Sequence, residues 1–268
     1  MISNYTPAQL QTLENLAISI HRLQGDGPIP TAVEFINEGK GSFSGCIRGL
    51  NSLHDLKTNH AWFADHNLAE FKLQAYITSK LHYIHCIEVE AQGLTTEDQY
   101  FFGLLSDYEP LIRWMVGLQP SSTSLVKYIE NPKDHMYRQW QMTLALRGDW
   151  QNLRERAELF LQDVPPKMKK YAVDQRFYLA LSKGDSNAMQ VALEELISPK
   201  VATIRNKVFE LAFSSKFISS YATLYAKLAR RHGYEINLNT PLIPLEWLPV
   251  AALPGYEDPY EFMRKYVI

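Results

Sequence analysis

Apolar residues recur along most of this chain at the three- and four-residue spacing of amphipathic helices. The first pattern follows Thr6 and Pro7, a pairing favoured at a helix start, and continues through Ile20. A longer pattern begins at Asp65 and ends at Gly93. Shorter patterns predict helices over 31–38, from Thr95 or Thr96, from Pro110, from Asn131-Pro132, from Ser198-Pro199 and from Phe217 to Arg231. Residues 39–45 are predicted to be a loop, followed by an irregular stretch around His54, His60 and His66.

Two helical hairpins are predicted in the middle of the chain. Gly148-Asp149 and Gly184-Asp185 lie 36 positions apart, and each pair separates two patterns of helical spacing. Glycine accepts the left-handed conformation that ends many helices, and aspartate caps the helix that follows. Units of this length favour a tetratricopeptide-like stack. The alternative is a chance recurrence, because helical hairpins often end in Gly-Asp and two units are few for a solenoid.

The C-terminal part of the chain, from His232 to Phe262, breaks the helical pattern. Gly233 predicts a helix end, residues 235–238 form at most one short strand, and five prolines follow between Pro241 and Pro259. Proline lacks an N–H and has a fixed φ, which excludes a continued helix. The segment is nevertheless rich in leucine, isoleucine, valine and tryptophan, so we expect it to pack against the helices rather than remain disordered.

These patterns predict an all-α fold of stacked antiparallel helices with an irregular, proline-rich C-terminal tail. We expect one domain over residues 1–268, because no Gly/Ser linker or low-complexity run divides the chain. Its expected parts are an N-terminal helical half over 1–130, helical-hairpin repeats over 131–232 and a docked tail over 233–268. The N-terminal half is the expected partner-binding part.

The composition is that of an ordinary globular protein, with 46% apolar residues and a formal net charge of −2. The sequence shows neither a basic-then-apolar signal segment nor an apolar run of about 18 residues, so we expect no membrane association. Cys46 and Cys86 lack C-x-x-C spacing, and we interpret them as buried thiols in a reducing compartment. The expected location is the cytoplasm.

Candidate catalytic and metal-binding groups are few. His82 and His85 share one helical face beside Cys86, and histidine and cysteine are zinc ligands. No third and fourth ligand has a matching spacing, so we interpret the histidines as ordinary helix-surface and core-edge side chains. The sequence has no G-x-S-x-G turn, no phosphate-binding glycine motif and no paired catalytic carboxylates. We therefore expect no metal, no cofactor and no enzymatic activity.

Charge is unevenly distributed along the chain. Between Lys80 and Arg113 there are six acidic residues and neither lysine nor arginine, and tyrosines lie among the acids. An acidic surface steers a basic partner, and tyrosine is common in binding hot spots. The alternative is a set of solvated helix faces whose charges segregated by chance. With Tyr100 and Tyr108 as the surface aromatics, the candidate partner-binding residues are Glu88, Glu90, Glu97, Asp98, Tyr100, Asp107, Tyr108 and Glu109.

A basic stretch provides a rival hypothesis. From Lys167 to Arg231 there are twelve bases and five acids, and stacked helical repeats are known to bind RNA. The residues available for phosphate contact are Lys200, Arg205, Lys207, Lys216, Lys227, Arg230 and Arg231. The chain as a whole is not basic and shows no repeated base-reading triplet, so nucleic-acid binding is disfavoured.

A set of short motifs in fixed order occupies roughly residues 170 to 262. They are Asp174-Gln175-Arg176-Phe177-Tyr178-Leu179-Ala180-Leu181, Gly184-Asp185, Ala192-Leu193-Glu194-Glu195-Leu196, Ser198-Pro199-Lys200, Arg205, Tyr225-Ala226-Lys227-Leu228-Ala229, His232-Gly233-Tyr234-Glu235, Pro241-Leu242-Ile243-Pro244, Glu246-Trp247-Leu248-Pro249 and Tyr256-x-Asp258-Pro259-Tyr260-x-Phe262. In their order and spacing, these motifs resemble the immunity protein 49 family.

The resemblance implies an all-helical cytoplasmic protein without catalysis, encoded beside a polymorphic toxin in bacteria. Such a protein binds its cognate toxin, often a nuclease, and blocks the toxin's active site or substrate. A helical-repeat adaptor for other proteins is the alternative function. The motif residues are expected to hold the fold rather than touch the partner; these are Gly184, Asp185, Pro199, Gly233, Pro241, Pro244, Trp247, Pro249, Asp258, Pro259 and Tyr260.

Overall fold

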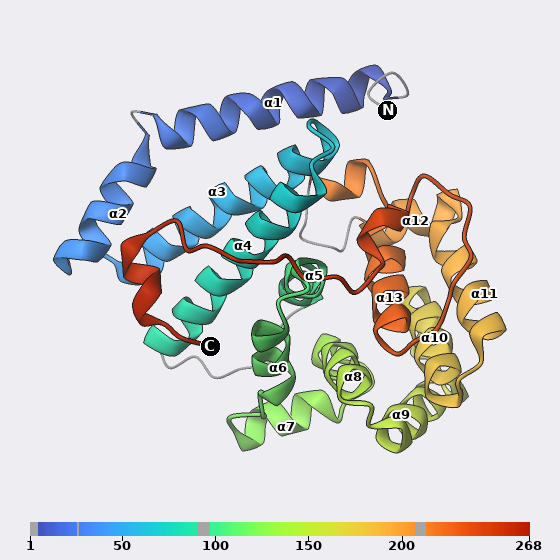
Figure 1. The fold of residues 1–268 in the computed structure, drawn as a ribbon. Coiled ribbons are helices and arrows are strands. Elements are labelled where there is room, and N and C mark those ends of the chain that lie inside the picture. Colours follow the sequence, from blue (N-terminus) through green and yellow to red (C-terminus); the bar gives the residue numbers. More distant parts are fainter. Residues whose placement is uncertain (1–4, 26, 90–96, 207–212) are drawn as a thin grey trace. The chain divides into compact units, whose positions relative to one another are not determined.

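The computed structural model describes residues 5–25, 27–89, 97–206 and 213–268, without the side chains of 97–99. Within these residues the chain forms thirteen α-helices, several short 3₁₀ helices and no β-strand, which confirms the all-α prediction (Figure 1). The α-helices are α1 Pro7–Gln24, α2 Pro28–Glu38, α3 Phe43–Phe63, α4 Leu68–Glu88, α5 Glu97–Ser106, α6 Glu109–Gly117, α7 Thr123–Ile129, α8 His135–Arg147, α9 Trp150–Gln162, α10 Ala172–Lys183, α11 Ser186–Ile197, α12 Pro199–Asn206 and α13 Ser220–Arg231.

The chain divides into two compact units. The first unit comprises Met1–Gln92, Phe102–Trp114 and Ala251–Ile268, and the second comprises Gly93–Phe101 and Met115–Val250. The tail is therefore shared, with its first part in the second unit and its last part in the first. The single domain with divisions at residues 130 and 232 stays a prediction.

In the first unit, α3 and α4 run side by side and α1 and α2 pack against α3 (Figure 1). Sequence reasoning missed α3, which begins within the predicted loop over 39–45 and continues through most of the predicted irregular stretch. Ser42 caps it by accepting a hydrogen bond from the Gly45 N–H at 3.2 Å. Many of its positions are polar, yet two of them are buried with hydrogen-bond partners. His54 hydrogen-bonds to Gln74 and Tyr260, and Thr58 donates to the His54 carbonyl within α3. That pattern hides the apolar face on which helix prediction depends.

The last residues of the tail complete the core of the first unit. Phe262, Met263 and Tyr266 pack in one buried cluster with side chains of α2, α3, α4 and α6. Segments separated by almost the whole chain thus share one core. The first unit cannot bury this apolar surface without the tail.

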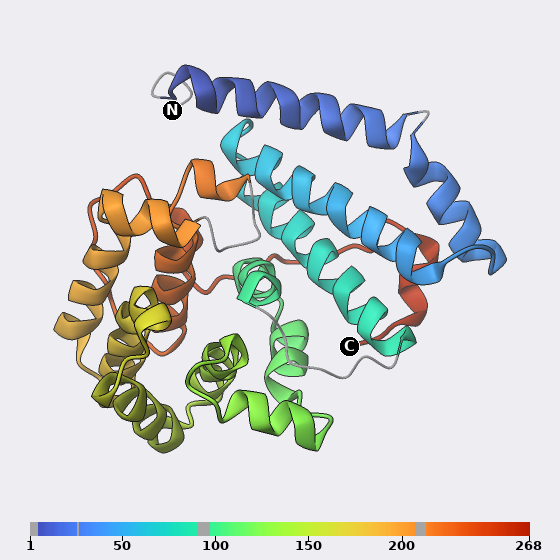
Figure 2. The ribbon, with the colours of Figure 1, turned by 180° about the vertical axis from the view of Figure 1, so that it is seen from behind.

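In the second unit, the two predicted helical hairpins are present as α8–α9 and α10–α11 (Figure 2). Gly148 and Gly184 end their helices with φ of 70° and 68°. The side chains of Asp149 and Asp185 cap the helices that follow by accepting hydrogen bonds from backbone N–H groups. The predicted capping chemistry is confirmed at both turns. The tetratricopeptide-like stacking stays a prediction.

Other boundaries differ from the sequence-based ones. Asp134, rather than Asn131, caps α8 by accepting a hydrogen bond from the Met136 N–H, and α7 precedes it. Phe217 lies before α13, and residues 235–238 form no strand. The predicted helix end at Gly93 and the predicted caps at Thr95 and Thr96 lie outside the described residues.

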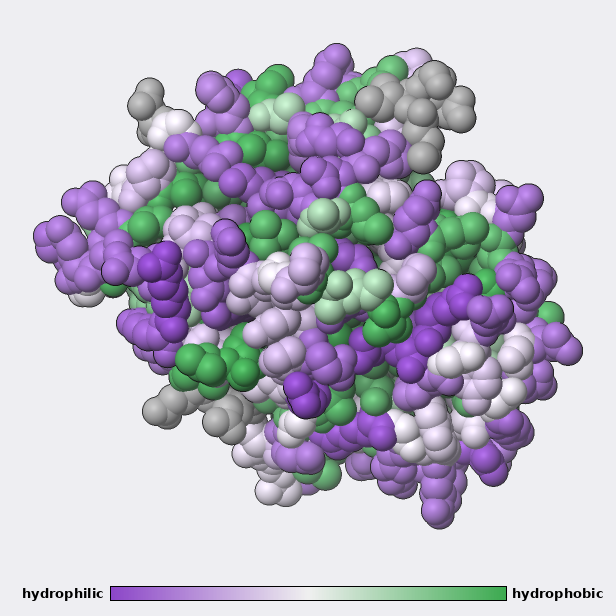
Figure 3. Space-filling model, viewed as in Figure 1, coloured by the Kyte–Doolittle hydropathy of each residue, from purple (hydrophilic) through white to green (hydrophobic). Residues whose placement is uncertain are grey.

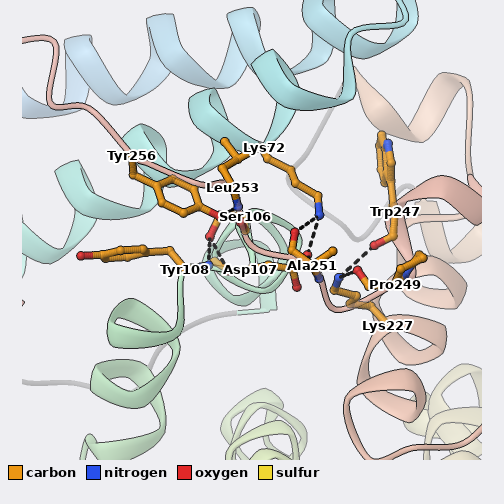
Figure 4. A network of polar contacts seen from close by, with 11 residues as sticks. Lys72, Ser106, Asp107, Tyr108, Lys227, Trp247, Pro249, Ala251, Leu253 and Tyr256 are labelled. Carbon is orange, nitrogen blue, oxygen red and sulfur yellow. Dashed lines mark hydrogen bonds and ion pairs between the residues drawn. The ribbon is translucent and has the colours of Figure 1, made fainter.

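The first part of the tail is fixed to α13 by a buried lysine. Lys227 is fully buried, and its ammonium donates to the carbonyls of Trp247 at 2.9 Å and Pro249 at 2.8 Å (Figure 4). Trp247 is itself buried, with its ring edge-to-face with Phe101 at 6.2 Å. The expectation of a packed tail is met here by both charge-assisted hydrogen bonds and apolar burial.

Trp247→Ala is expected to lower the free energy of unfolding by about 3–5 kcal/mol, the usual cost of deleting a buried large side chain. Leu245→Ala is the matched control, because Leu245 lies in the same 3₁₀ helix but is half exposed. It should cost less than about 1 kcal/mol. Urea unfolding followed by circular dichroism measures both variants. Equal, small losses would show that the tail contributes little to stability.

Candidate partner-binding surface

The acidic residues singled out in the sequence have different environments. Glu88 ends α4 and Glu109 begins α6, and both are exposed. Glu109 in the first helical turn is favoured by the helix dipole. Glu90 lies outside the described residues, and Glu97 and Asp98 lie in the first turn of α5 without described side chains. The described surface part of the acidic window is therefore Glu88 and Glu109.

Asp107 is not a surface residue, which corrects its place among the candidates. It is buried at 3% exposure, has a left-handed φ of 56°, and forms an ion pair with Lys72 at 2.8 Å. Its carboxylate also accepts from the Ala251 N–H at 3.2 Å, and Lys72 donates to the Ala251 carbonyl as well (Figure 4). An unpaired charge at this depth would be strongly unfavourable, and Lys72 supplies the opposite charge. The same carboxylate binds the tail within the first unit.

The expectation that Tyr100 lies at the surface is also wrong. Its side chain is 1% exposed, and its hydroxyl hydrogen-bonds to the Thr143 hydroxyl at 2.7 Å. Tyr108 is half-buried, with ring centroids 4.8 Å from Tyr76 and 4.9 Å from Tyr256. Both aromatic rings thus pack within the fold, as core aromatics usually do.

Glu88 takes part in a contact with the tail. Its carboxylate accepts a hydrogen bond from the Tyr266 hydroxyl. Burial, and then this hydrogen bond, raises the pKa of Tyr266 above its usual value. Because Tyr266 stays protonated, the hydroxyl keeps its donor, and the end of α4 is fixed to the tail.

The first unit also has a groove that sequence reasoning did not predict. It has a volume of about 450 Å³, and its lining residues are Tyr83, Pro110, Arg113, Trp114, Val267 and Ile268. All six belong to the first unit. Figure 3 shows apolar side chains gathered near the C-terminal end of the chain, beside hydrophilic ones. The aromatic residues within the acidic window were the only part of the sequence that indicated this groove. Nothing in the sequence indicated that Val267 and Ile268 of the tail would complete it.

The other candidate sites are used for structure. Arg205 and Lys227, from the basic stretch, are fully buried, and Lys207 lies outside the described residues. Arg205 forms an ion pair with Asp174 at 2.8 Å. Arg230 pairs with Glu235 at 2.8 Å. These contacts remove much of the surface that a nucleic-acid site needs.

His82 and Cys86 of α4 form a half-buried pair. Cys86 Sγ lies 3.4 Å from His82 Nε2, whereas His85 contacts the Ser44 hydroxyl at 2.7 Å. Burial lowers the pKa of His82 to about 4 and raises the pKa of Cys86 to about 11. A neutral imidazole beside a protonated thiol is a packing contact. The described part of the chain holds no cluster of three or more metal-binding side chains.

The motif residues of the tail make long-range contacts in the first unit. Asp258 accepts from Tyr76 at 2.8 Å and from Lys80 at 2.7 Å. Tyr260 donates to Nε2 of His54 at 2.9 Å, and Pro259 is exposed beside them. All three polar contacts join positions that are far apart in the sequence.

The remaining motif residues lie in the second unit. Pro199 begins α12, and Gly233 has a φ of 81° after α13. Gly184 leaves room for Tyr234, because an added Cβ would lie 3.0 Å from its hydroxyl. Pro241 is exposed and Pro244 is buried. These glycines and prolines lie at turns and element ends, as expected from their backbone chemistry.

Comparison with known protein families gives one decisive match, to the model described as immunity protein 49, over residues 122–247. Over these residues, somewhat less than half of the chain, the sequence is similar to the immunity protein 49 family. The match covers the hairpins α8–α11, α12, α13 and the tail as far as Trp247. Neither the curated proteins nor the solved structures gave a match. No helix among the described residues is both long and apolar enough to cross a membrane.

Lys72→Met is expected to lower the free energy of unfolding by about 3–5 kcal/mol, because it leaves the Asp107 carboxylate buried without its cation. Lys40→Met is the matched control, since Lys40 forms an exposed pair with Glu38 at 2.7 Å. That variant should change stability by less than about 1 kcal/mol. Urea unfolding at neutral pH compares them. A loss no greater than that of the control would mean that the buried pair is not what holds the tail.

Stability is expected to fall as the pH drops from about 7 to about 5. Burial lowers the pKa of His54 to about 4, from 6.5. Below 6.5 the unfolded chain therefore binds a proton that the folded chain does not, which favours unfolding. His54→Gln replaces the imidazole with an amide, which offers a donor and an acceptor but does not titrate. It should reduce the loss of unfolding free energy over this pH range by about 2 kcal/mol. Denaturant unfolding across this range measures it; parallel profiles for both proteins would contradict the assignment.

Proposed function

We propose that this protein is an immunity protein that binds a cognate bacterial toxin and neutralises it by covering the toxin's active site. The family match over residues 122–247 carries this proposal. Members of such a family act by binding, so a toxin partner and the absence of catalysis are implied together. The toxin is proposed to be a nuclease or another enzyme that acts inside the cell.

The use of the buried ionisable groups supports a binding protein rather than an enzyme. Lys72 pairs with Asp107, Lys80 with Asp258 and Arg205 with Asp174. Each pair links two elements of its own unit. Groups engaged in this way stabilise a rigid surface, whereas catalysis requires reactive groups that converge in an accessible cleft.

A cytoplasmic location is part of the same proposal. Cys46 and Cys86 are both free thiols. Free thiols are typical of reducing compartments, where glutathione and thioredoxin prevent disulfide formation. An immunity protein in the cytoplasm meets a toxin where that toxin would act.

The purified protein and the toxin domain encoded beside its gene are expected to co-elute from a size-exclusion column at micromolar concentration. Equimolar protein should also suppress the toxin's activity, because a covered active site excludes substrate. A toxin domain from an unrelated gene pair serves as the control and should elute separately. Separate elution of the cognate pair, or unchanged toxin activity in the mixture, would exclude this function.

A further inference from the structure

The groove of the first unit is lined by three separate stretches of the chain. Its volume of about 450 Å³ lies within the roughly 300–1,000 Å³ range of protein binding pockets. Tyr83 comes from α4, Pro110, Arg113 and Trp114 come from α6, and Val267 and Ile268 come from the tail. All of these side chains except that of Arg113 are apolar or aromatic, so a ligand that fills the groove is largely apolar.

Contacts within the chain fix the aromatic walls of the groove. The Tyr83 ring lies edge-to-face with the Trp114 ring, with centroids 5.0 Å apart, and the Tyr83 hydroxyl donates to the Val267 carbonyl at 3.2 Å. His82 lies edge-on to Trp114 from the other side of Tyr83 along α4, with ring centroids 6.0 Å apart. A surface that is already ordered loses little conformational entropy on binding, which favours affinity.

The charge inside the groove is positive. Among the described residues that line it, Arg113 is the only one with a charged side chain. Arg113 is exposed, and its guanidinium makes no hydrogen bond or ion pair within the described part of the chain. A guanidinium is a planar fork of donors that binds a carboxylate through two parallel hydrogen bonds. Arg113 is therefore available to a carboxylate of a partner.

Two acids on the same helices do not line the groove, but they limit how acidic its ligand can be. The Glu88 carboxylate accepts from the Tyr266 hydroxyl, and Glu109 precedes Arg113 by one helical turn. Like charges repel, so these acids disfavour a ligand with several negative charges. They leave room for a single carboxylate that reaches Arg113 directly.

The apolar part of the groove calls for more than a free anion. Val267 is 84% exposed, and Trp114 and Tyr83 are only half-buried. Tyrosine, tryptophan and arginine carry much of the binding energy in protein interfaces. A large apolar side chain that covers this surface removes it from water, which a bound anion alone does not. A protein segment with both groups complements the groove.

We propose that this groove receives a segment of the cognate toxin in which a single aspartate or glutamate lies beside a large apolar side chain. This inference rests on the proposed immunity function and specifies its interface. The carboxylate binds the Arg113 guanidinium, and the apolar side chain packs against Trp114 and Val267. The groove lies outside residues 122–247, so this contact belongs to the part of the chain that the family model does not match.

Three substitutions of Arg113 test the charge, with the cognate toxin domain as the probe in calorimetry. Arg113→Glu is expected to weaken toxin binding at least about tenfold, because two carboxylates would then face each other. Arg113→Met keeps an apolar stem without the charge, so it should weaken binding and also reduce the salt dependence of the affinity. Arg113→Lys keeps the charge and should preserve that salt dependence, although it loses the paired hydrogen bonds.

Val267→Asp tests the apolar wall. It places a negative charge where the apolar side chain of the toxin would pack, beside the carboxylate that Arg113 binds. It is expected to weaken binding at least about tenfold, as for a central interface residue. Because Val267 is exposed, the substitution leaves the core of the first unit unchanged.

Matched controls make the same chemical changes away from the groove. Arg22→Glu alters an exposed arginine of α1, and Val126→Asp alters an exposed valine of α7. Both are expected to bind the toxin within about threefold of the unaltered protein, since surface positions outside an interface are nearly neutral. Circular dichroism and the urea midpoint of each variant confirm that it is folded.

The outcomes separate the two proposals. If the unaltered protein binds the toxin and Arg113→Glu and Val267→Asp bind equally well, the groove assignment is wrong and the immunity function stands. Tighter binding by Arg113→Glu would show a basic segment in the groove and overturn the proposed chemistry. A dimer that becomes a monomer in Val267→Asp would instead make the groove a contact between two copies of this chain. No binding by the unaltered protein overturns both proposals.

Discussion

The tail depends on buried lysines that donate hydrogen bonds to its carbonyl groups. Its prolines lack N–H groups, and its described residues form no strand, so its backbone has no regular partner. Lys227 satisfies carbonyls of the part that belongs to the second unit. Lys72, paired with Asp107, does the same for Ala251 in the first unit. A buried ammonium needs such acceptors as much as the carbonyls need a donor, so the tail and the helices fix each other.

This constraint reaches the core of the first unit. Phe262 and Met263 follow the anchored residues of the tail in the chain, and they pack with side chains from near the start of the chain. The polar contacts of Asp258 and Tyr260 with α3 and α4 set the register of that packing. Hydrophobic burial supplies the driving force, whereas directional hydrogen bonds select one position of the tail.

The family match and the groove have different locations in the sequence. The family match covers the helical hairpins and the anchored first part of the tail, which are defined by caps, turns and buried pairs. The groove lies in the other unit, where helix ends and the final tail residues meet. Since Val267 and Ile268 form one of its walls, the groove exists only when the tail is docked.

The sequence alone determined the turns of the two helical hairpins. Gly148, Asp149 and their counterparts at the second hairpin act through hydrogen bonds that span only a few residues, so their roles followed from residue type and spacing. Only the tertiary structure decided which charged and aromatic residues remain at the surface. The sequence pattern predicted Asp107 and Tyr100 at the surface. In the structure Asp107 is buried with Lys72, 35 positions away, and Tyr100 is buried with Thr143, 43 positions away. Burial depends on contacts between distant segments, and a pattern read along the chain does not contain them.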